Sequence, residues 1–505
     1  MYPIDFFWRA AHRYPNRPAV IHGARTITFA ELSERVGCAA ALLRERTPDD
    51  RSYICVGAAN SVDHLIAILA VLAADKIWVP LNPRNGDPEL RRIIDFVDPA
   101  LVVLDGPMQN RLPGMAGRAL DIAELLAANV LTSGPKLTSV VPPLEATQAV
   151  KFTGGTTGFP KGVMQPLRAW NTNIVTQIHE LGLNEHDRYL VAAPLTHGTS
   201  TYMLPLLGRG GALIFPAESD PAGLLDSAKS NNATIFFAPP TLILALSAEQ
   251  DRRPRALQCL RYVVYGGAPM RPDHILQAQA SFGQVICTTY GQTEAPQIIT
   301  FLSPSDITGK SASVGRPTLL TDVGILSRDG ELLPLGEEGE IAVRGDLVMT
   351  GYLKAEAETR KTLVDGWLRT GDLGVLDEGR YLFIKDRIRD VIITGGFNVY
   401  PSDVEVVMLR HAAIAECSIV GVPDEKWGEA VHAAVQIRPG SRLNSEEIVS
   451  IVKQELGSVK APKEIHVFDA LPRSPVGKVL KAAIREEILR RRASEAVQGG
   501  VDTRP

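Results

Sequence analysis

The 505-residue sequence has few cysteines, no marked excess of charge of either sign and no apolar run long enough to cross a membrane. Its five cysteines are scattered without a Cys-x-x-Cys pair, which argues against a zinc site and a disulfide framework and fits a reducing compartment. The formal net charge of −4 gives no reason to expect nucleic acid or an anionic membrane as a partner. The longest apolar run, Leu65 to Ala74, is too short to span a bilayer and predicts a buried helix.

Several other signals are missing. The N-terminus lacks the succession of basic, apolar and small residues typical of a secretory signal, and the last residues match no retention or peroxisomal address, so we expect a cytoplasmic protein. There is no repeat with a period of 20–50 residues, which excludes a solenoid. Residues 208–211, Gly-Arg-Gly-Gly, do not complete the glycine fingerprint of a nicotinamide-binding fold.

What the sequence does contain is a regular alternation of strands and helices. Apolar strand-like runs at Tyr53–Val56 and Leu101–Leu104 are each flanked by helical stretches, and a second such succession covers about residues 170–300. Residues 28–31, Thr-Phe-Ala-Glu, form a capping box that predicts the start of a helix. The alternation is typical of an α/β fold with parallel, layered sheets, and the length predicts more than one domain.

The pattern changes after Ser303, where short apolar strands are separated by polar turns up to about Lys385. We therefore expect a large N-terminal domain, residues 1–388, made of two α/β layered subdomains plus a small β-barrel or sheet. Residues 389–505 are expected to form a small C-terminal α/β lid domain. The tail after about residue 491 is expected to be disordered.

The most informative stretch is a glycine- and threonine-rich loop at residues 153–162, directly after the apolar run 149–152. Three of its glycines, at positions 154, 155 and 158, let backbone N–H groups approach an anion, while threonine hydroxyls and a lysine add donors and charge, so the loop is suited to a phosphate. It is not a Walker A loop, because Phe159-Pro160 separates the last glycine from the lysine. A generic surface turn is the alternative. The candidate phosphate-binding residues are Thr153, Gly154, Gly155, Thr156, Thr157, Gly158 and Lys161.

Two further motifs carry groups that suit a nucleotide. Tyr290-Gly291-Gln292-Thr293-Glu294 follows a strand-like run, and it offers a flat ring, a hydroxyl and a carboxylate that can hold a purine, a phosphate oxygen and Mg²⁺. Thr370-Gly371-Asp372 places a carboxylate in a loop, where it can accept hydrogen bonds from ribose hydroxyls. Each motif alone is also compatible with an ordinary turn.

Taken in order, these stretches resemble the motifs of the adenylate-forming superfamily, which includes acyl-CoA synthetases, peptide-synthetase adenylation domains and beetle luciferases. The resemblance covers about residues 10–485. The phosphate loop departs from the usual form at Gly154, where the family has serine. The resemblance implies that Tyr290 stacks on adenine, that Thr293 contacts the α-phosphate or the acyl carboxylate, and that Glu294 orients Mg²⁺. The resemblance also implies that the ribose is bound by Asp372 and Arg387, and that adenine is flanked by Gly266, Gly267 and Ala268.

The same resemblance assigns a hinge, a thiol channel and a catalytic lysine. Arg389 matches the hinge residue between the two domains, with Asp390 as the neighbouring candidate. Gly395 and Gly396 would line the tunnel for the pantetheine arm of CoA, although a β-hairpin with a Gly-Gly turn also explains them. Lys478 matches the lysine that catalyses adenylation.

The acyl end is matched less sharply. Residues 193–198 resemble Pro-Leu-Phe-His-x-x-Gly with threonine in place of the aromatic residue, and a core histidine bonded to a backbone carbonyl is the alternative for His197. The candidate acyl-pocket residues are His197, Thr199, Met203, Gly291, Pro296 and Gln297. They are mostly small or uncharged, and no arginine could be placed among them for a dicarboxylate. We therefore expect a medium-chain or aromatic monocarboxylate.

The resemblance implies an ATP-dependent carboxylic acid–CoA ligase that forms an acyl-adenylate and then a thioester. Its catalytic residues would be Lys478, Thr293, Glu294 and His197, and its cofactors Mg²⁺, ATP and coenzyme A. Two alternatives stay open: an adenylation enzyme that loads a carrier protein, and a nucleotide-binding protein without turnover. The expected partners are small molecules, with no nucleic acid and no membrane span, and a homodimer is an open alternative.

Overall fold

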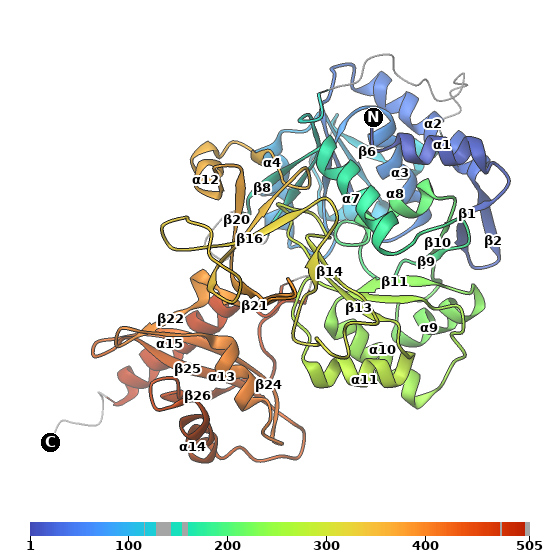
Figure 1. The fold of residues 1–505 in the computed structure, drawn as a ribbon. Helices are drawn as coiled ribbons and strands as arrows, with labels where there is room; N and C mark the ends of the chain where they lie inside the picture. Colours follow the sequence, from blue (N-terminus) through green and yellow to red (C-terminus); the bar gives the residue numbers. More distant parts are fainter. Residues whose placement is uncertain (116, 128–142, 154–159, 475–476, 500–505) are drawn as a thin grey trace.

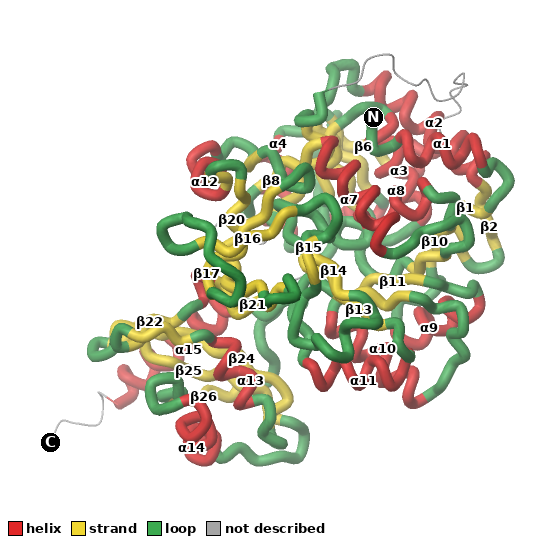
Figure 2. The backbone as a smooth tube through the Cα atoms, in the orientation of Figure 1, coloured by secondary structure: helices red, strands yellow, loops and turns green. Residues whose placement is uncertain are grey.

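The computed structural model describes the chain except for residues 116, 128–142, 154–159, 475–476 and 500–505, and it does not describe the side chains of residues 493–499. The described residues form four β-sheets. Figure 1 shows a large N-terminal body and a smaller C-terminal unit beside it, and Figure 2 shows helices against the sheets in both. No helix in the described ranges has both the length and the apolar character needed to cross a membrane.

One sheet of the large domain has seven strands in the order β18-β8-β7-β4-β3-β5-β6. Helices α4 and α5 cover one face, and helices α2, α3 and α6 cover the other. The strands are β3 (Tyr53–Gly57), β4 (Ile77–Pro80), β5 (Leu101–Leu104), β6 (Ala119–Asp121), β7 (Thr147–Phe152), β8 (Gly162–Pro166) and β18 (Gly351–Tyr352). The helices are α2 (Phe29–Arg46), α3 (Val62–Ala73), α4 (Asp87–Val97), α5 (Gly106–Arg111) and α6 (Ile122–Leu126).

Local sequence signals explain where these helices begin. The Thr28 hydroxyl accepts from the Glu31 backbone while the Glu31 carboxylate accepts from the Thr28 backbone, so the expected capping box starts α2. Ser61 caps α3 by accepting from the backbone of His64. Helix α3 is buried throughout its middle, as its apolar run predicted.

The other sheet of the large domain has nine strands in the order β15-β14-β13-β12-β11-β9-β10-β1-β2. Its strands are β1 (Pro18–His22), β2 (Arg25–Thr28), β9 (Arg188–Leu190), β10 (Ala212–Phe215), β11 (Ile235–Ala238), β12 (Tyr262–Tyr265), β13 (Ile286–Tyr290), β14 (Thr300–Leu302) and β15 (Arg316–Pro317). Its helices are α1 (Asp5–Arg13), α7 (Leu167–Glu180), α8 (Ser200–Gly208), α9 (Pro221–Ser230), α10 (Pro240–Arg252) and α11 (Pro272–Phe282).

The two large sheets share one apolar core. Helices α2, α3, α7 and α8 contribute buried side chains to a cluster that also contains strand residues of both sheets, while α9, α10 and α11 cover the outer face of the nine-stranded sheet. The two expected α/β layers are confirmed. The hairpin β1–β2 joins the nine-stranded sheet rather than the sheet next to it in sequence, because β1 pairs in parallel with β10.

Most strands of the segment after Ser303 form an antiparallel sheet, which is one of the two forms, barrel or sheet, expected for it. Its strands are β16 (Asp322–Leu326), β17 (Glu338–Arg344), β19 (Leu363–Val364), β20 (Trp367–Leu376) and β21 (Leu382–Arg387), with α12 (Glu356–Thr362) before β19. Strand β16 forms one edge, and the two-residue strand β19 and β21 share the other side of β20. No pairing among the described strands joins β16 to β21, so the sheet stays open.

The C-terminal unit has its own sheet and core, as expected for a small α/β domain. It contains the short helix η1 (Ile388–Asp390) and β22 (Ile392–Thr394), β23 (Phe397–Val399), α13 (Pro401–Met408), β24 (Ile414–Asp424), β25 (Gly428–Ile437), α14 (Ser445–Leu456), β26 (Glu464–Val467) and α15 (Lys481–Gly499). The tail expected to be disordered after residue 491 is instead helical as far as Gly499. A boundary between residues 388 and 389 stays a prediction.

Candidate active site

Three of the predicted segments follow the carboxyl ends of parallel strands. Thr153 follows β7, Gly266 follows β12 and Gly291 follows β13. Ligands of open α/β sheets bind outside these ends, which fits the nucleotide-binding prediction. The backbone N–H of Thr153 donates to the carbonyl of Lys161 at 3.1 Å, closing the base of the phosphate loop. Gly154, Gly155, Thr156, Thr157 and Gly158 lie outside the described residues.

The carboxylate of Asp372 has the most polar contacts of the predicted site residues: two hydrogen bonds and an ion pair. It is almost fully buried, and its Oδ2 accepts from the Tyr290 hydroxyl and from the Gln292 amide, both at 2.7 Å. The Arg387 guanidinium lies 3.4 Å from its Oδ1, because Asp372 and Arg387 face each other across β20 and β21. The structure therefore brings three predicted nucleotide-binding residues together, with Tyr290 and Arg387 beside the Asp372 carboxylate.

Burial and the adjacent Asp372 carboxylate raise the pKa of Tyr290 well above its usual value, so the phenol stays protonated and donates. Gln292, the variable position of its motif, was not a predicted site residue. Its amide also donates to the Thr370 carbonyl at 3.0 Å, which fixes the loop that carries Asp372. Gly266 is buried and Gly267 has a φ of +79°, which favours glycine, while Ala268 follows on the same loop.

Glu294 is held from one side only. Its Oε1 accepts from the Tyr352 hydroxyl at 2.9 Å, and its Oε2 has no hydrogen-bond partner among the described residues. A carboxylate with one oriented and one free oxygen fits Mg²⁺, which prefers oxygen ligands. Burial first, and then the Glu294 charge, raise the pKa of Tyr352, which keeps this donor protonated.

Lys161, the lysine of the phosphate loop, lies beside Tyr352, the residue that donates to Glu294. The Lys161 Nζ lies 4.9 Å from the centre of the Tyr352 ring and 2.8 Å from Glu358. Both partners of this ion pair are well exposed, so the pair is weakly held and leaves Lys161 free to exchange Glu358 for a phosphate. The backbone carbonyl of Thr293, the residue before Glu294, accepts from the Gln165 amide at 2.8 Å.

Lys478 reaches the site from the C-terminal domain. Its neighbour Gly477 packs beside the first turn of α10, where an added Cβ would lie 3.6 Å from the Thr241 hydroxyl. The Lys478 side chain keeps solvent access, yet the surrounding protein lowers its pKa, mainly through desolvation and then through the Arg387 charge. Asp372 and Glu294 act in the opposite direction on the same pKa, so Lys478 lies within electrostatic range of both carboxylates.

His197 lies in the loop before α8 and is only partly exposed. Its Nδ1 is 3.0 Å from the Thr196 hydroxyl, so its described ring partner is a hydroxyl and not a backbone carbonyl. Burial and the positive charges of Lys151 and Lys478 lower the pKa of His197 to about 4, and the ring is therefore neutral near pH 7. It can act there as a hydrogen-bonding group but carries no charge.

Three of the predicted acyl-pocket residues, Thr199, Met203 and Gln297, lie beside an aromatic stack. The Tyr202 ring lies 5.2 Å from that of Tyr189 and 5.7 Å from that of Phe237. Gly198 packs against Phe237, where a Cβ would come within 2.5 Å of the ring. Thr199 and Met203 are fully buried beside this stack.

Gln297 closes the same region from the loop that follows β13. It has a positive φ of +66°, and its amide donates to the Tyr202 hydroxyl at 2.9 Å and to the Thr289 hydroxyl at 3.1 Å. Gly291 must be glycine here, because a Cβ would lie 2.5 Å from the Gln297 backbone. The turn of the motif therefore fixes the wall of the acyl region.

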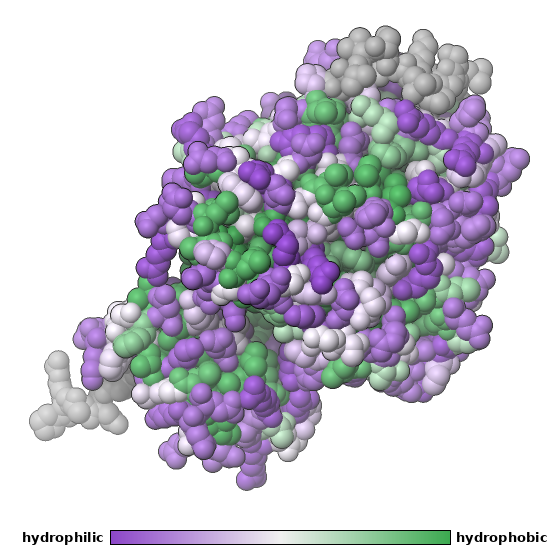
Figure 3. Space-filling model, viewed as in Figure 1, coloured by the Kyte–Doolittle hydropathy of each residue, from purple (hydrophilic) through white to green (hydrophobic). Residues whose placement is uncertain are grey.

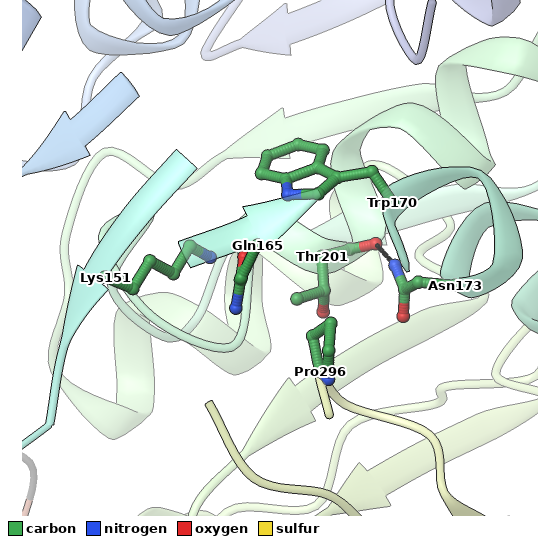
Figure 4. Close-up of a pocket in the computed structure, with 6 residues that line it drawn as sticks. All are labelled: Lys151, Gln165, Trp170, Asn173, Thr201 and Pro296. Carbon is green, nitrogen blue, oxygen red and sulfur yellow. Dashed lines mark hydrogen bonds between the residues drawn. The ribbon is translucent and has the colours of Figure 1, made fainter. Parts of the chain in front are cut away.

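A small cavity lined mostly by residues with polar groups lies at the acyl end of the site. Figure 4 shows Lys151 and Trp170 pointing into it from opposite walls, with Gln165 between them. Pro296 was a predicted pocket residue, whereas Lys151 was not. The only sequence signal for Lys151 was a charge inside the apolar run 149–152. The lining residues are Lys151, Gln165, Trp170, Asn173, Thr201 and Pro296.

The predicted hinge and thiol-channel residues lie in adjoining segments of the C-terminal domain. Arg389 and Asp390 form the short helix η1 between β21 and β22. Gly395 and Gly396 form the two-residue turn between β22 and β23, with φ values of +57° and +83°. A Gly-Gly hairpin turn thus explains their local geometry. Their role toward CoA stays a prediction.

The described residues also contain one group of histidine and acidic side chains with metal-like spacing. His432 on β25 and His466 on β26 face each other with ring nitrogens 3.0 Å apart, and Glu464 lies 3.8 Å and 3.5 Å from them. The two nitrogens are already at hydrogen-bond distance, so this group is satisfied without an ion. This group lies in the small domain, and none of its members is a predicted site residue.

Known proteins match the chain along most of its length. Residues 7–353 match the family model described as AMP-binding enzyme, and residues 403–478 match the AMP-binding enzyme C-terminal domain. The chain is 35% identical to a medium/long-chain-fatty-acid–CoA ligase (FadD8) of Mycobacterium tuberculosis, over 94% of this chain and 88% of that protein. It is 34% identical to a feruloyl-CoA synthase of an Amycolatopsis species, over 94% and 97%.

Solved structures of the same kind match the fold. The o-succinylbenzoate CoA synthetase MenE of Bacillus subtilis, in complex with its acyl-adenylate intermediate, aligns with a TM-score of 0.86 and 28% identity, over 95% of this chain and 97% of that chain. The amide bond synthetase McbA of Marinactinospora thermotolerans aligns with a TM-score of 0.88 and 29% identity, over 96% and 99%.

Proposed function

Since the chain belongs to the AMP-binding enzyme family, we propose that it activates one particular class of carboxylic acid with ATP and transfers the acyl group to the thiol of CoA. At the level of the family it is an AMP-forming acid–thiol ligase that uses ATP, Mg²⁺ and CoA, like its named relatives. The acid and the individual residue roles are what we propose here.

One observation supports these roles most strongly. Lys478 of the C-terminal domain lies within electrostatic range of Asp372, Glu294 and His197 of the large domain. The lysine, the carboxylate proposed to bind Mg²⁺ (Glu294) and the carboxylate proposed to bind the ribose (Asp372) then lie together near the carboxyl ends of the strands. This is the set of groups that adenylate formation needs.

In the first half-reaction, the substrate carboxylate attacks the α-phosphate of ATP and pyrophosphate leaves. Negative charge crowds this transition state, so catalysis is a matter of positioning and of donors placed in advance. Lys478 and the phosphate loop, including Lys161, supply positive charge and donors. Asp372 and Arg387 hold the ribose, and Glu294 would hold Mg²⁺, which neutralises phosphate charge. No side-chain nucleophile is required.

In the second half-reaction, the CoA thiol attacks the acyl-adenylate carbonyl and AMP leaves. Lys478 then has to withdraw so that a thiol can reach the carbonyl. A small domain joined through the short segment Ile388–Asp390 is suited to such a rotation. The described arrangement, with Lys478 in the site, suits the first half-reaction.

The walls of the acyl region support an acid with an apolar body. The stack of Tyr189, Tyr202 and Phe237 offers aromatic surface, and the buried Met203 adds an adaptable apolar side chain. We infer a medium-chain or aromatic acid, and the named relatives act on acids of both kinds, fatty acids and ferulate.

The test is pyrophosphate release over a panel of aliphatic and aromatic acids, with and without CoA, and with the product identified by mass. We expect acid-dependent pyrophosphate release and an acyl-CoA product. Acid-dependent release without any acyl-CoA would favour a carrier protein or another acceptor. ATP binding without pyrophosphate release from any acid would favour a nucleotide-binding protein without turnover.

A further inference from the structure

Lys151 is a charged side chain in a place where a fatty acyl group would require none. It lies on β7, two residues before the phosphate loop, and its side chain is almost completely buried. Its ammonium group lies 5.0 Å from the ring centre of Trp78 and 5.6 Å from that of Trp170, so it is enclosed by indole faces. Cation–π attraction offsets part of the cost of burying the ammonium group, but this attraction supplies no hydrogen-bond acceptor for the N–H donors of Lys151.

The donors in this cavity outnumber their partners. The Lys151 ammonium donates to the Ser200 hydroxyl at 2.8 Å, and Ser200 in turn donates to the His197 carbonyl. No other hydrogen bond of Lys151 and no ion pair is found among the described residues, so two of its N–H donors are left over. The indole Nε1 of Trp170, which lines the same cavity, is also buried without a partner.

Unpaired buried donors are costly, and most such groups in native proteins have a partner. Here Trp170, which carries the indole N–H, and Lys151, which carries the ammonium group, line one small cavity (Figure 4). An acceptor from a bound molecule would satisfy both. Desolvation lowers the pKa of Lys151 to about 7, and an acceptor in the cavity would restore the charged form.

The cavity adjoins the acyl end of the site. Pro296 and Thr201, which line it, are sequence neighbours of the predicted acyl-pocket residues Gln297 and Thr199. Gln165, another lining residue, donates to the Thr293 carbonyl of the nucleotide motif. The Lys151 charge contributes to the lowered pKa of His197, so the lysine lies near the acyl end.

We propose that Lys151 and Trp170 bind a second oxygen atom of the acid, one that is distant from the carboxylate that reacts. This inference rests on the proposed function and narrows its substrate class. The acid is then a bifunctional one, such as an oxo acid or a hydroxyaryl acid, and not a plain alkanoate. The earlier expectation of an uncharged pocket is revised, because the cation in the wall is a lysine from β7 and not an arginine of the pocket loops.

The size of the cavity favours a single oxygen. It has room for roughly one water molecule between its side chains, so a carbonyl or phenolate oxygen fits more readily than a whole carboxylate. A carbonyl oxygen has two lone pairs, which matches two donors from opposite walls. A distal carboxylate would require the lining side chains to move.

The experiment measures kcat/KM for pyrophosphate release with matched acids. The probes are phenylpropanoate with its para-hydroxy and para-carboxy derivatives, and octanoate with oxo-octanoates in which the ketone is moved along the chain. We expect the wild-type enzyme to prefer an acid with a distal single oxygen over its plain analogue by about tenfold or more, because a site built to hydrogen-bond an oxygen rejects the analogue without it.

Three variants make the test specific. Lys151→Met removes the ammonium group with little change in length, and it should lower kcat/KM for the oxygen-bearing acids far more than for the plain acids, so that the preference is lost. Trp170→Phe removes the indole N–H and should weaken the preference to a smaller extent. Lys76→Met is the matched control, because Lys76 is also a buried lysine but donates to the Thr47 and Asp49 carbonyls, and it should leave the preference unchanged.

Thermal shift with the same acids gives a readout that does not depend on turnover. An acid with a distal oxygen should raise Tm in the wild type but not in Lys151→Met. Equal kcat/KM for plain and oxygen-bearing acids, or an equal loss for both kinds in Lys151→Met, would overturn the proposal. If no acid releases pyrophosphate, the proposed function fails. The thermal shifts alone then test whether Lys151 binds the distal oxygen.

Discussion

The hydroxyl of Tyr290 lies 2.7 Å from the Oδ2 atom of Asp372, although the two residues are 82 positions apart in sequence. This hydrogen bond ties the nucleotide motif after β13 to the middle of β20. Together with Gln292 and Arg387 it orients the Asp372 carboxylate before any nucleotide binds. The site is therefore preorganised where the ribose is expected, and the predictions below test its parts.

Replacement of Asp372 should weaken ATP binding. We expect Asp372→Ala to raise the apparent KM for ATP by about ten- to a hundredfold, because hydrogen bonds to a charged group contribute about 1.5–3 kcal/mol. The ribose contact is made in the ground state and in the transition state, so kcat should change less. Steady-state kinetics with varied ATP measures this. An unchanged KM with a reduced kcat would contradict the ribose role.

Tyr352 should matter for the metal. The Tyr352→Phe variant loses the donor that orients Glu294, and we expect the Mg²⁺ concentration needed for half-maximal rate to rise by about tenfold, as is common when a metal ligand loses its outer partner. Tyr53→Phe is a matched control on β3, away from the site. An identical Mg²⁺ dependence of the two variants would show that Tyr352 does not support Glu294.

Lys151 should leave a signature in the pH dependence of stability. Burial lowers the pKa of Lys151 to about 7 in the folded protein, while the unfolded chain keeps the ordinary value near 10.5. Between these values the unfolded state binds more protons, so this group makes the free energy of unfolding rise by about 1.4 kcal/mol per pH unit from about pH 7 to 10. Below pH 7 its contribution to the slope vanishes.

Chemical denaturation of the ligand-free enzyme at several pH values measures this slope. The other titrating groups are common to the wild type and Lys151→Met, so the difference between the two isolates Lys151. The free energy of unfolding should climb less steeply with pH in the variant. Parallel curves across this range would mean that the pKa of the buried lysine is not lowered.

A proline at the hinge should separate the two half-reactions. Proline fixes φ near −65°, which suits the short 3₁₀ helix Ile388–Asp390 of the described arrangement but resists a later rotation there. We expect Arg389→Pro to form acyl-AMP normally and to discharge it to CoA much more slowly. Single-turnover mixing of enzyme, acid and ATP, followed by addition of CoA, measures the decay of acyl-AMP.

Arg389→Ala is the matched control for this variant, because it removes the same side chain and leaves the backbone free to rotate. It should discharge acyl-AMP at close to the wild-type rate. If the proline variant also discharges at that rate, the rotation occurs elsewhere, and Asp390 is the next position to test.

Much of the fold could be predicted because its signals are local. The capping box before α2, the apolar runs of β3, β5 and α3, and the change of pattern after Ser303 each depend on neighbouring residues only. Pairing over long distances could not be predicted in this way. Barrel and sheet both stayed open for the segment after Ser303, because closure depends on whether its first and last strands pair, and the place of β1 depends on its pairing with β10.

The same distinction between local and long-range signals applies to the residues of the site. Tyr290, Asp372 and Lys478 were predicted because each lies in a motif, and the structure brings them to one place. Lys151 and Tyr352 were missed because their roles arise only from the packing of separate elements. Lys151 meets Trp170 of α7, and Tyr352 meets Glu294 after β13. Figure 3 shows mixed polar and apolar residues over the viewed face, so surface pattern alone does not mark the site.

The central claim is that Lys478 serves adenylate formation in the described arrangement and leaves for thioester formation. The most direct measurement assays the two half-reactions separately in Lys478→Ala, with pyrophosphate release for the first and acyl-CoA formation from a preformed acyl-adenylate for the second. We expect the first to fall by two to three decades, the cost of one preorganised donor of about 3–4 kcal/mol, and the second to stay near wild type. An equal loss in both half-reactions would contradict the account.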